Sequence, residues 1–225
     1  MLLQILTYTH HLTTMLFGIF LSAFFLGVKQ NKKNVCILLG GGAVSGLFFL
    51  ICNTVFGSLF TEAVYPIFVH LPLFLLLVFY YRFRWLPSII SIMTAYLCCQ
   101  FSNWAGIFAL SLSGLEWVYY LVRIIVTVAV FAFLSRYLCQ TTALLFAKSD
   151  RELYILGAMP FVYYVFDYST TKFSMLLYSG NKVVVEFLAF AMCISYVIFL
   201  FVYFQEYELK NRAEQYLSLI HISEP

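Results

Sequence analysis

The chain has 225 residues, of which 63% are hydrophobic, 20% aromatic and 10% charged, and its mean hydropathy is +0.92. Soluble domains average about 45–50% apolar and about 25% charged residues, so this composition excludes a soluble globular protein and predicts a multi-pass membrane protein. The net charge of +3 is interpreted as a membrane-orientation signal and not as a sign of nucleic-acid binding.

Seven apolar segments follow one another along the chain, and a transmembrane helix needs about 20 such residues. The predicted fold is therefore an all-α bundle of seven transmembrane helices, with six as the alternative count. Gly42 and Gly46 form a small-xxx-small pair that predicts close packing of the second segment against a neighbouring helix. The predicted spans are 5–28, 35–56, 63–81, 86–110, 117–138, 152–168 and 183–204.

The connections between these segments alternate in charge. Cations follow spans one, three, five and seven, whereas Glu62 and Glu116 lie in the second and fourth connections, and Asp167 accompanies Lys172 and Lys182 in the sixth. Because cytoplasmic connections are enriched in Lys and Arg, we expect the N-terminus outside and the last helix leading into the cytoplasm. An even number of spans would break this alternation, which favours seven. The cations concerned are Lys29, Lys32, Lys33, Arg82, Arg84, Arg136, Lys148, Arg151, Lys210 and Arg212.

Polar residues within the predicted spans collect in their outer halves, while the inner halves are nearly pure hydrocarbon. Intramembrane ionisable groups cost about 2.5–3.5 kcal/mol each at the centre of a span, so they indicate a partner, a water-filled cavity or an interface. We expect a cavity open to the outside, in which the carboxylate of Glu116 or Glu186 neutralises Arg123. The candidate ligand-binding residues are His70, Asn103, Arg123, Asp167 and Glu186.

Each of these candidates has a simpler interpretation. Arg123 and Glu186 are equally compatible with interfacial side chains that extend to water. His70 and Asn103 are compatible with hydrogen bonds between helices. His10 and His11 are expected among the lipid headgroups. The sequence shows neither a catalytic motif nor a metal-binding motif, and the cysteines are interpreted as buried thiols, so no catalytic residue, metal or cofactor is assigned to this chain.

The last span runs without Gly or Pro into the charged segment 205–216, which is rich in good helix formers. This continuity predicts a rod that carries a displacement from the bilayer into the cytoplasm, with Glu206, Leu209 and Ala213 on the signalling helix. Val202, Leu209 and Tyr216 share one heptad position, which permits a parallel homodimer. We therefore divide the chain into a transmembrane sensor domain, 1–205, and the start of a cytoplasmic dimerisation helix, 206–216.

The final nonapeptide, Leu217 to Pro225, resembles the conceptual translation of a transposase adapter used in short-read library preparation. We therefore expect the native part of the sequence to end at about Tyr216 and interpret 217–225 as an adapter-derived artefact. His221 consequently carries no weight as a phosphate acceptor.

Seven spans, an outside N-terminus and the exit segment from Tyr203 to Asn211 together resemble the N-terminal sensor region of bacterial accessory-gene-regulator-type histidine kinases. That resemblance implies a multi-pass protein of the bacterial plasma membrane. It also implies an extracellular ligand, either a peptide or a small molecule, and a downstream GHKL-type kinase domain that would bind ATP and magnesium. The family's phospho-accepting and nucleotide-binding motifs have no match in this chain. The alternative function is a small membrane transporter or substrate-capture subunit.

Overall fold

The computed structural model describes residues 2–57, 60–61, 64, 66–147, 150–172 and 182–223; the side chains of 151, 168–172, 182–186 and 214–223 lie outside this description. Every regular element in the described residues is helical. The elements are α1 (Leu2–Phe25), α2 (Lys32–Phe56), η1 (Pro66–His70), α4 (Leu71–Leu75), η2 (Leu76–Tyr80), α5 (Trp85–Cys98), α6 (Gln100–Ser113), α7 (Glu116–Tyr137), α8 (Cys139–Phe146), α9 (Asp150–Lys172) and α11 (Lys182–Ser223).

Four helices in the described parts of the chain are long and apolar enough to cross a membrane, and Pro66–Tyr80 is a shorter apolar helix. The all-α membrane fold predicted from the sequence is thereby confirmed. Helices α1, of 24 residues, and α9, of 23 residues, are long but carry more polar side chains, so the count of seven spans stays a prediction. The four helices are Lys32–Phe56, Trp85–Ser113, Glu116–Tyr137 and Phe187–Ala213.

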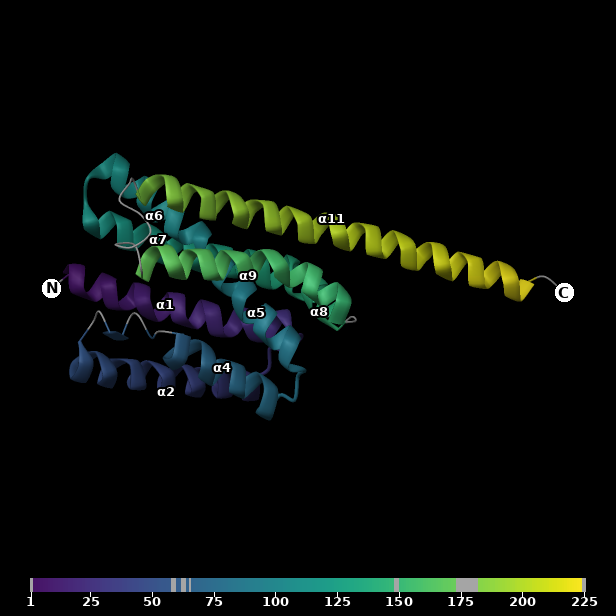
Figure 1. Ribbon diagram of the computed structural model, residues 1–225, viewed down its shortest axis with the longest axis horizontal. Helices are drawn as coiled ribbons and strands as arrows, with labels where there is room; N and C mark the ends of the chain where they lie inside the picture. Colours follow the sequence, from purple (N-terminus) through teal and green to yellow (C-terminus); the bar gives the residue numbers. More distant parts are fainter. Residues whose placement is uncertain are drawn as a thin grey trace.

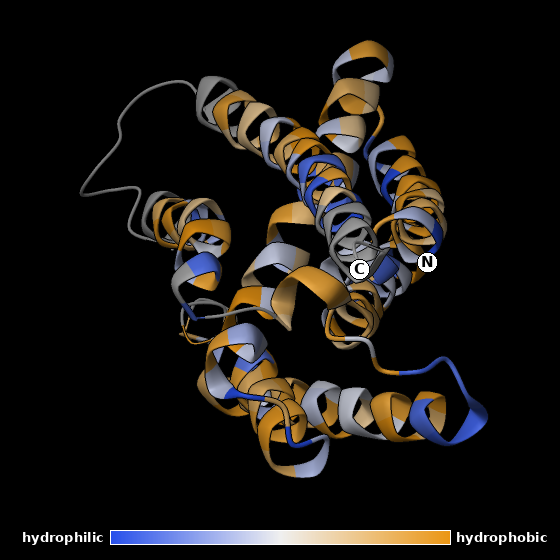
Figure 2. Cartoon of the chain, turned by 90° about the vertical axis from the view of Figure 1, so that its right-hand side faces the viewer, coloured by the Kyte–Doolittle hydropathy of each residue, from blue (hydrophilic) through white to orange (hydrophobic). Residues whose placement is uncertain are grey.

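The helices run back and forth along one axis, so that alternate connections meet at the same end of the bundle (Figure 1). The connections after α1 and η2 lie at one end together with α8 and the start of α9, and α11 projects beyond the bundle at that end. Viewed from that side, the helices are mostly hydrophobic, and several of the connections are hydrophilic (Figure 2). We call this the basic end, because these are the connections that carry the cations. The expected cytoplasmic location of the basic end stays a prediction.

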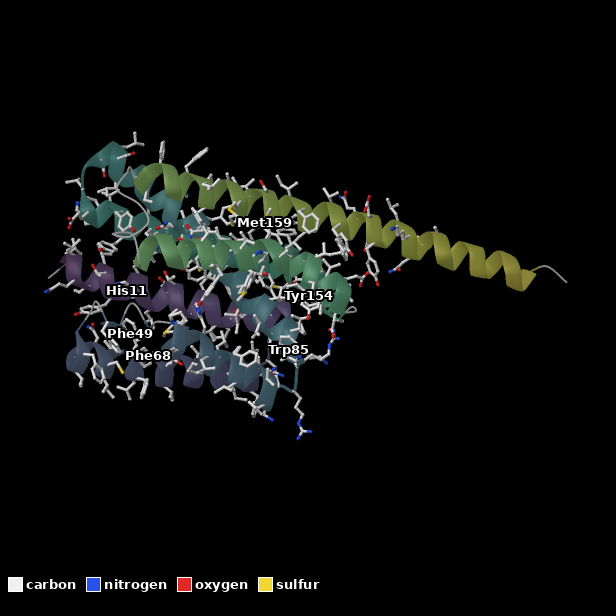
Figure 3. All side chains as sticks on the ribbon, in the orientation of Figure 1. His11, Phe49, Phe68, Trp85, Tyr154 and Met159 are labelled. Carbon is white, nitrogen blue, oxygen red and sulfur yellow. The ribbon has the colours of Figure 1, made fainter. Side chains whose placement is uncertain are left out.

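The start of α5 and the start of α9 meet at the basic end. The Arg84 guanidinium donates a hydrogen bond to the Asp150 carboxylate at 2.7 Å, and both side chains are exposed. An ion pair this exposed contributes about 0–1 kcal/mol to stability. Trp85 and Tyr154 are also exposed at this end (Figure 3), and such amphipathic aromatic side chains are typical of a membrane interface.

Two predicted boundaries were wrong. Helix α9 continues to Lys172, so Asp167 lies inside the helix and not in the connection that follows it. Its internal Pro160 is buried and does not end the helix. The fourth predicted span consists of α5 and α6 joined at Cys99, and it ends where Gly114 adopts a left-handed φ of 67°, which favours glycine. The rest of the predicted sixth connection, 173–181, lies outside the described residues.

Small residues bring the helices into close contact. A Cβ at Gly42 would lie 3.1 Å from the Cδ1 of Ile19, and a Cβ at Gly46 would lie 3.5 Å from the Cε of Met15. The predicted close packing at this glycine pair is thereby confirmed, with α1 as the neighbour. A Cβ at Gly157 of α9 would lie 2.7 Å from two carbons of the Ile90 side chain on α5.

Helix α11 is a single helix of 42 residues, which corresponds to about 63 Å at a rise of 1.5 Å per residue. Its inner face is buried in the bundle at Ala189, Cys193, Tyr196 and Leu200, which recur at helical spacing. The helix then continues past the bundle as an isolated rod (Figure 1). The predicted junction without a break between span and rod is confirmed, and the helix includes the backbone of 217–223.

The contact between α5 and α11 can be tested by oxidative cross-linking. The side chains of Cys98 on α5 and Cys193 on α11 are neighbours in the bundle, and both are buried. In a variant that retains only these two cysteines, we expect a membrane-permeant oxidant to form an intrachain disulfide, detected by mass spectrometry of the peptides. A matched variant that retains Cys36 and Cys193 should give none, because Cys36 is exposed on α2. Equal yields from the two variants would contradict this packing.

Candidate functional site

Five polar and aromatic side chains from three parts of the chain meet in the bundle, and we call them the tyrosine cluster. The Nδ1 of His70 and the hydroxyl of Tyr164 form a hydrogen bond of 2.9 Å, and the hydroxyl of Tyr96 donates to the Asp167 carboxylate at 2.5 Å. Tyr163 completes the cluster. The segment 66–80, α5 and α9 each contribute at least one member, so these hydrogen bonds link elements that are distant in sequence.

The rings of the tyrosine cluster pack against one another. The ring centroids of Tyr96 and Tyr164 are 5.1 Å apart, those of Tyr96 and Tyr163 6.0 Å, and those of His70 and Tyr96 5.6 Å. Tyr163 is fully buried, and its hydroxyl has no partner among the described residues. These side chains therefore fill the space between the helices themselves. They form a polar junction inside the bundle.

The tyrosine cluster lies inside the bundle, away from the connections of the basic end. Asp167 is the eighteenth of the 23 residues of α9, which begins at the basic end, and His70 is the last residue of η1. The collection of polar residues in the outer halves of the spans stays a prediction. Intramembrane polar groups of this kind mark functional sites by default.

A second group, the arginine site, consists of Arg123 and the side chains around it on α1, α6 and α7. The Nη1 of Arg123 donates to the Tyr119 hydroxyl, and its guanidinium carbon lies 5.1 Å from the centroid of that ring. His10 is 3% exposed, packs its ring 5.8 Å from that of Tyr120 and lies close enough to Arg123 to interact electrostatically. The Nε of Arg123 is buried and has no partner among the described residues.

Gly106 makes room for the arginine. A Cβ at this position would contact the Arg123 Cγ, would lie 2.8 Å from its Cδ and would lie 3.1 Å from the Cδ2 of Tyr119. Helix α6 therefore packs directly on the aliphatic part of the arginine side chain. This packing holds the stem of Arg123 between α6 and α7, while its guanidinium contacts Tyr119.

The predicted pairing of Arg123 with Glu116 is wrong, because Arg123 uses Tyr119 and Glu116 is exposed. The ion pairs of the described side chains are Arg84 with Asp150 and Arg212 with Glu208. The alternative pairing with Glu186 concerns a side chain outside the described ones. The tyrosine four residues earlier, on the same face of α7, gives one nitrogen of the guanidinium an uncharged hydrogen-bond partner.

Of the five predicted site residues, the structure brings His70 and Asp167 together in the tyrosine cluster. The Nδ2 of Asn103 donates to the side-chain oxygen Oε1 of Gln100 at 3.3 Å within α6, and Arg123 belongs to the arginine site. Cys99, where α5 joins α6, lies close enough to both Arg123 and Asp167 to interact electrostatically with each. The two polar groups are therefore neighbours in the same half of the bundle.

Sequence reasoning missed the tyrosines and misplaced His10. Tyr96, Tyr163 and Tyr164 were not assigned to the site, and His10 was expected among headgroups although it is buried. A helical-face argument points to His10, because it lies on the same face as the buried Phe17 and Leu21. Near the basic end, buried Ser88 donates to the Arg84 carbonyl at 2.8 Å, so this end also contains buried polar groups.

Two hollows in the described structure lie away from these groups. An apolar one of about 270 Å³ lies between α6, α7 and α11, with Phe101, Val130 and Val197 in its wall. An open one of about 1030 Å³ lies at the basic end, where Lys29 and Arg136 line it. Neither is lined by a predicted ligand-binding residue. The outward-facing polar cavity stays a prediction. Within the described residues, no three His, Cys, Asp or Glu side chains are grouped to hold a metal ion.

The helices and their buried polar groups define an all-α, multi-pass membrane protein. Comparisons of the chain with protein-family models, curated proteins and solved structures found no match.

Proposed function

We propose that this chain is the membrane-embedded sensor of a two-component histidine kinase of the accessory-gene-regulator type in the bacterial plasma membrane. In this proposal, an extracellular peptide or small molecule changes the packing of the outer half of the bundle, and α11 carries the change into the cytoplasm. The observation that supports it most directly is α11, one helix that packs in the bundle and extends beyond it.

A polar connection links the site to the rod. The hydroxyl of Tyr196 on α11 donates to the Leu156 carbonyl on α9 at 2.9 Å and lies 3.5 Å from the Thr94 hydroxyl on α5. Helices α9 and α5 also carry Asp167 and Tyr96 of the tyrosine cluster. A ligand that moves α9 relative to α5 would therefore change the two contacts that hold Tyr196, and with them the position of α11 in the bundle. It shifts the signalling equilibrium only if it binds one arrangement more tightly than the other.

The arginine site indicates what such a ligand would offer. The guanidinium of Arg123 is partly buried, its contacts in the described chain are uncharged groups, and its Nε has no partner there. A carboxylate or another anionic acceptor on the ligand would form a charge-assisted hydrogen bond with it. Its neighbours, His10 and Tyr120, add ring surface for an apolar part of the ligand.

The rod supports the proposed homodimer. Leu209 is 67% exposed on the part of α11 beyond the bundle, where a lone helix has no apolar partner. Glu206 and Ala213 are exposed on the same rod. A second copy of the chain would cover Leu209 through a parallel helix pair, as the shared heptad position of Val202, Leu209 and Tyr216 permits.

Sequencing the genomic locus across the codon for Tyr216 tests the proposal. We expect native codons that differ from those for Leu217 to Pro225 and that continue the helix into a phospho-accepting segment and an ATP- and magnesium-binding kinase domain. A native stop codon soon after Tyr216 would contradict the kinase and favour a stand-alone membrane protein. Native codons that encode the tail itself would contradict the adapter interpretation.

A further inference from the structure

The hollow at the basic end combines cationic, polar and apolar surface. It has a volume of about 1030 Å³, and Lys29, Gln30, Arg136 and Gln140 supply its polar rim. Small-molecule sites in proteins span about 300–1,000 Å³, so the hollow can take a group of substantial size. All four rim side chains are exposed. The rim therefore offers amide groups and two positive charges.

The floor of the hollow comes from the end of α1 and from α8. Phe24 and Leu144 are among the apolar side chains in its lining. The chain leaves α1 through Gly27, whose φ is 84° and where a Cβ would lie 3.3 Å from the Cβ of Ala143 on α8. This close approach at a left-handed glycine sets the end of α1 directly against α8. The apolar floor and the cationic rim then lie side by side, where a membrane helix leaves the hydrocarbon.

Neither cation at the rim has an ion-pair partner among the described side chains. Lys29 and Arg136 form no ion pair within the described residues, whose two ion pairs use Arg84 and Arg212. The lining of the hollow contains no carboxylate. Unpaired cations at the edge of a membrane bundle attract anionic lipid headgroups, and basic pockets at the cytoplasmic side of helices bind them specifically.

From these features, we propose that the hollow between the end of α1, the end of α7 and α8 binds the phosphate headgroup of an anionic phospholipid of the adjacent leaflet. Lys29 and Arg136 pair with the phosphate, Gln30 and Gln140 hydrogen-bond to the headgroup, and an acyl chain covers the apolar floor. The occupant is a lipid and not a dissolved anion, because a dissolved anion would leave that floor exposed to water. This site does not depend on the proposed ligand sensing.

The test titrates the purified full chain in detergent with phosphatidylglycerol or phosphatidylcholine and counts retained lipids by native mass spectrometry. We expect the protein to retain phosphatidylglycerol preferentially. The double variant Lys29→Gln/Arg136→Gln should bind it about thirtyfold more weakly, since each basic side chain near an anionic surface contributes roughly fivefold. The matched control, Lys33→Gln/Arg82→Gln, removes the same charge at the same end outside the hollow and should bind like the unmodified chain.

Three outcomes would overturn the proposal. Equal retention of the two lipids would show that the site does not distinguish an anionic from a zwitterionic headgroup. Equal losses of phosphatidylglycerol binding in the two double variants would show that only the net charge of this end matters. Complete competition by glycerol phosphate at matched concentration would show a site for dissolved anions. Matched circular dichroism spectra of all variants exclude misfolding as the cause of a loss.

Discussion

Replacing Gly106 by alanine is expected to destabilise the bundle by about 1–3 kcal/mol, the usual cost of overpacking a closely packed interior. The added methyl group would lie 2.8 Å from the Cδ of Arg123, and the arginine is also held by Tyr119. The nearer contact is with the Cγ of the arginine, close to its backbone, where the side chain cannot simply swing aside. The measurement is the midpoint of thermal unfolding in detergent, followed by circular dichroism.

The control for Gly106→Ala is Gly40→Ala, because a Cβ at Gly40 of α2 has nothing within 4 Å. That change should be neutral or slightly stabilising, since alanine is favoured over glycine in a helix by roughly 0.5–1 kcal/mol. The double variant Gly106→Ala/Arg123→Ala should show that the alanine at 106 costs less once the arginine is truncated. Additive effects of the two substitutions would contradict the observed contact.

In the proposed histidine kinase, inserting one alanine after Gln205 is expected to change the kinase output several-fold, whereas inserting seven should largely restore it. Each residue turns the rod by about 100°, so seven residues return its faces to within roughly 20° of their original direction. Alanine keeps the segment helical because it has the highest helix propensity. The measurement is autophosphorylation in membrane vesicles with labelled ATP.

Insertions of two, three and four alanines complete this series. They distinguish an effect of the rotation of the rod from an effect of its length. Output that follows the angle of the rod supports transmission through α11, which the structure shows as one helix across the junction. Output that falls steadily with inserted length would instead indicate that distance matters and rotation does not. A substitution without insertion, Gln205→Ala, controls for the local change in sequence.

The helical architecture could be predicted from the sequence because each span needs only a run of about 20 apolar residues, a property local to the segment. The absence of Gly and Pro around residue 205 likewise predicted that α11 would continue unbroken. The end of α9 was predicted too early, since Asp167 was taken as a residue of the following connection. Inside the bundle its carboxylate accepts a hydrogen bond from Tyr96, which makes a helical position favourable.

The site could be predicted only in part, because its contacts join residues far apart in sequence. His70 and Tyr164 are separated by 94 positions, and Tyr96 and Asp167 by 71. A tyrosine in an apolar segment is also typical of a membrane interface, so its sequence alone does not reveal a buried role. For Arg123, the search for an opposite charge led to Glu116, two turns away, although the hydroxyl one turn away is within reach.

The hydrogen bond from the Tyr196 hydroxyl to the Leu156 carbonyl on α9 holds α11 at one point, about which the helix can tilt. Lys182 lies 14 residues before Tyr196, about 21 Å, and Tyr216 lies 20 residues after it, about 30 Å at 1.5 Å per residue. A stiff helix that tilts about this point has unequal arms, so the arm beyond the bundle sweeps about one and a half times as far as the arm that begins at Lys182. In the proposed orientation, a small rearrangement at the extracellular end would therefore reach the cytoplasm enlarged and reversed in direction.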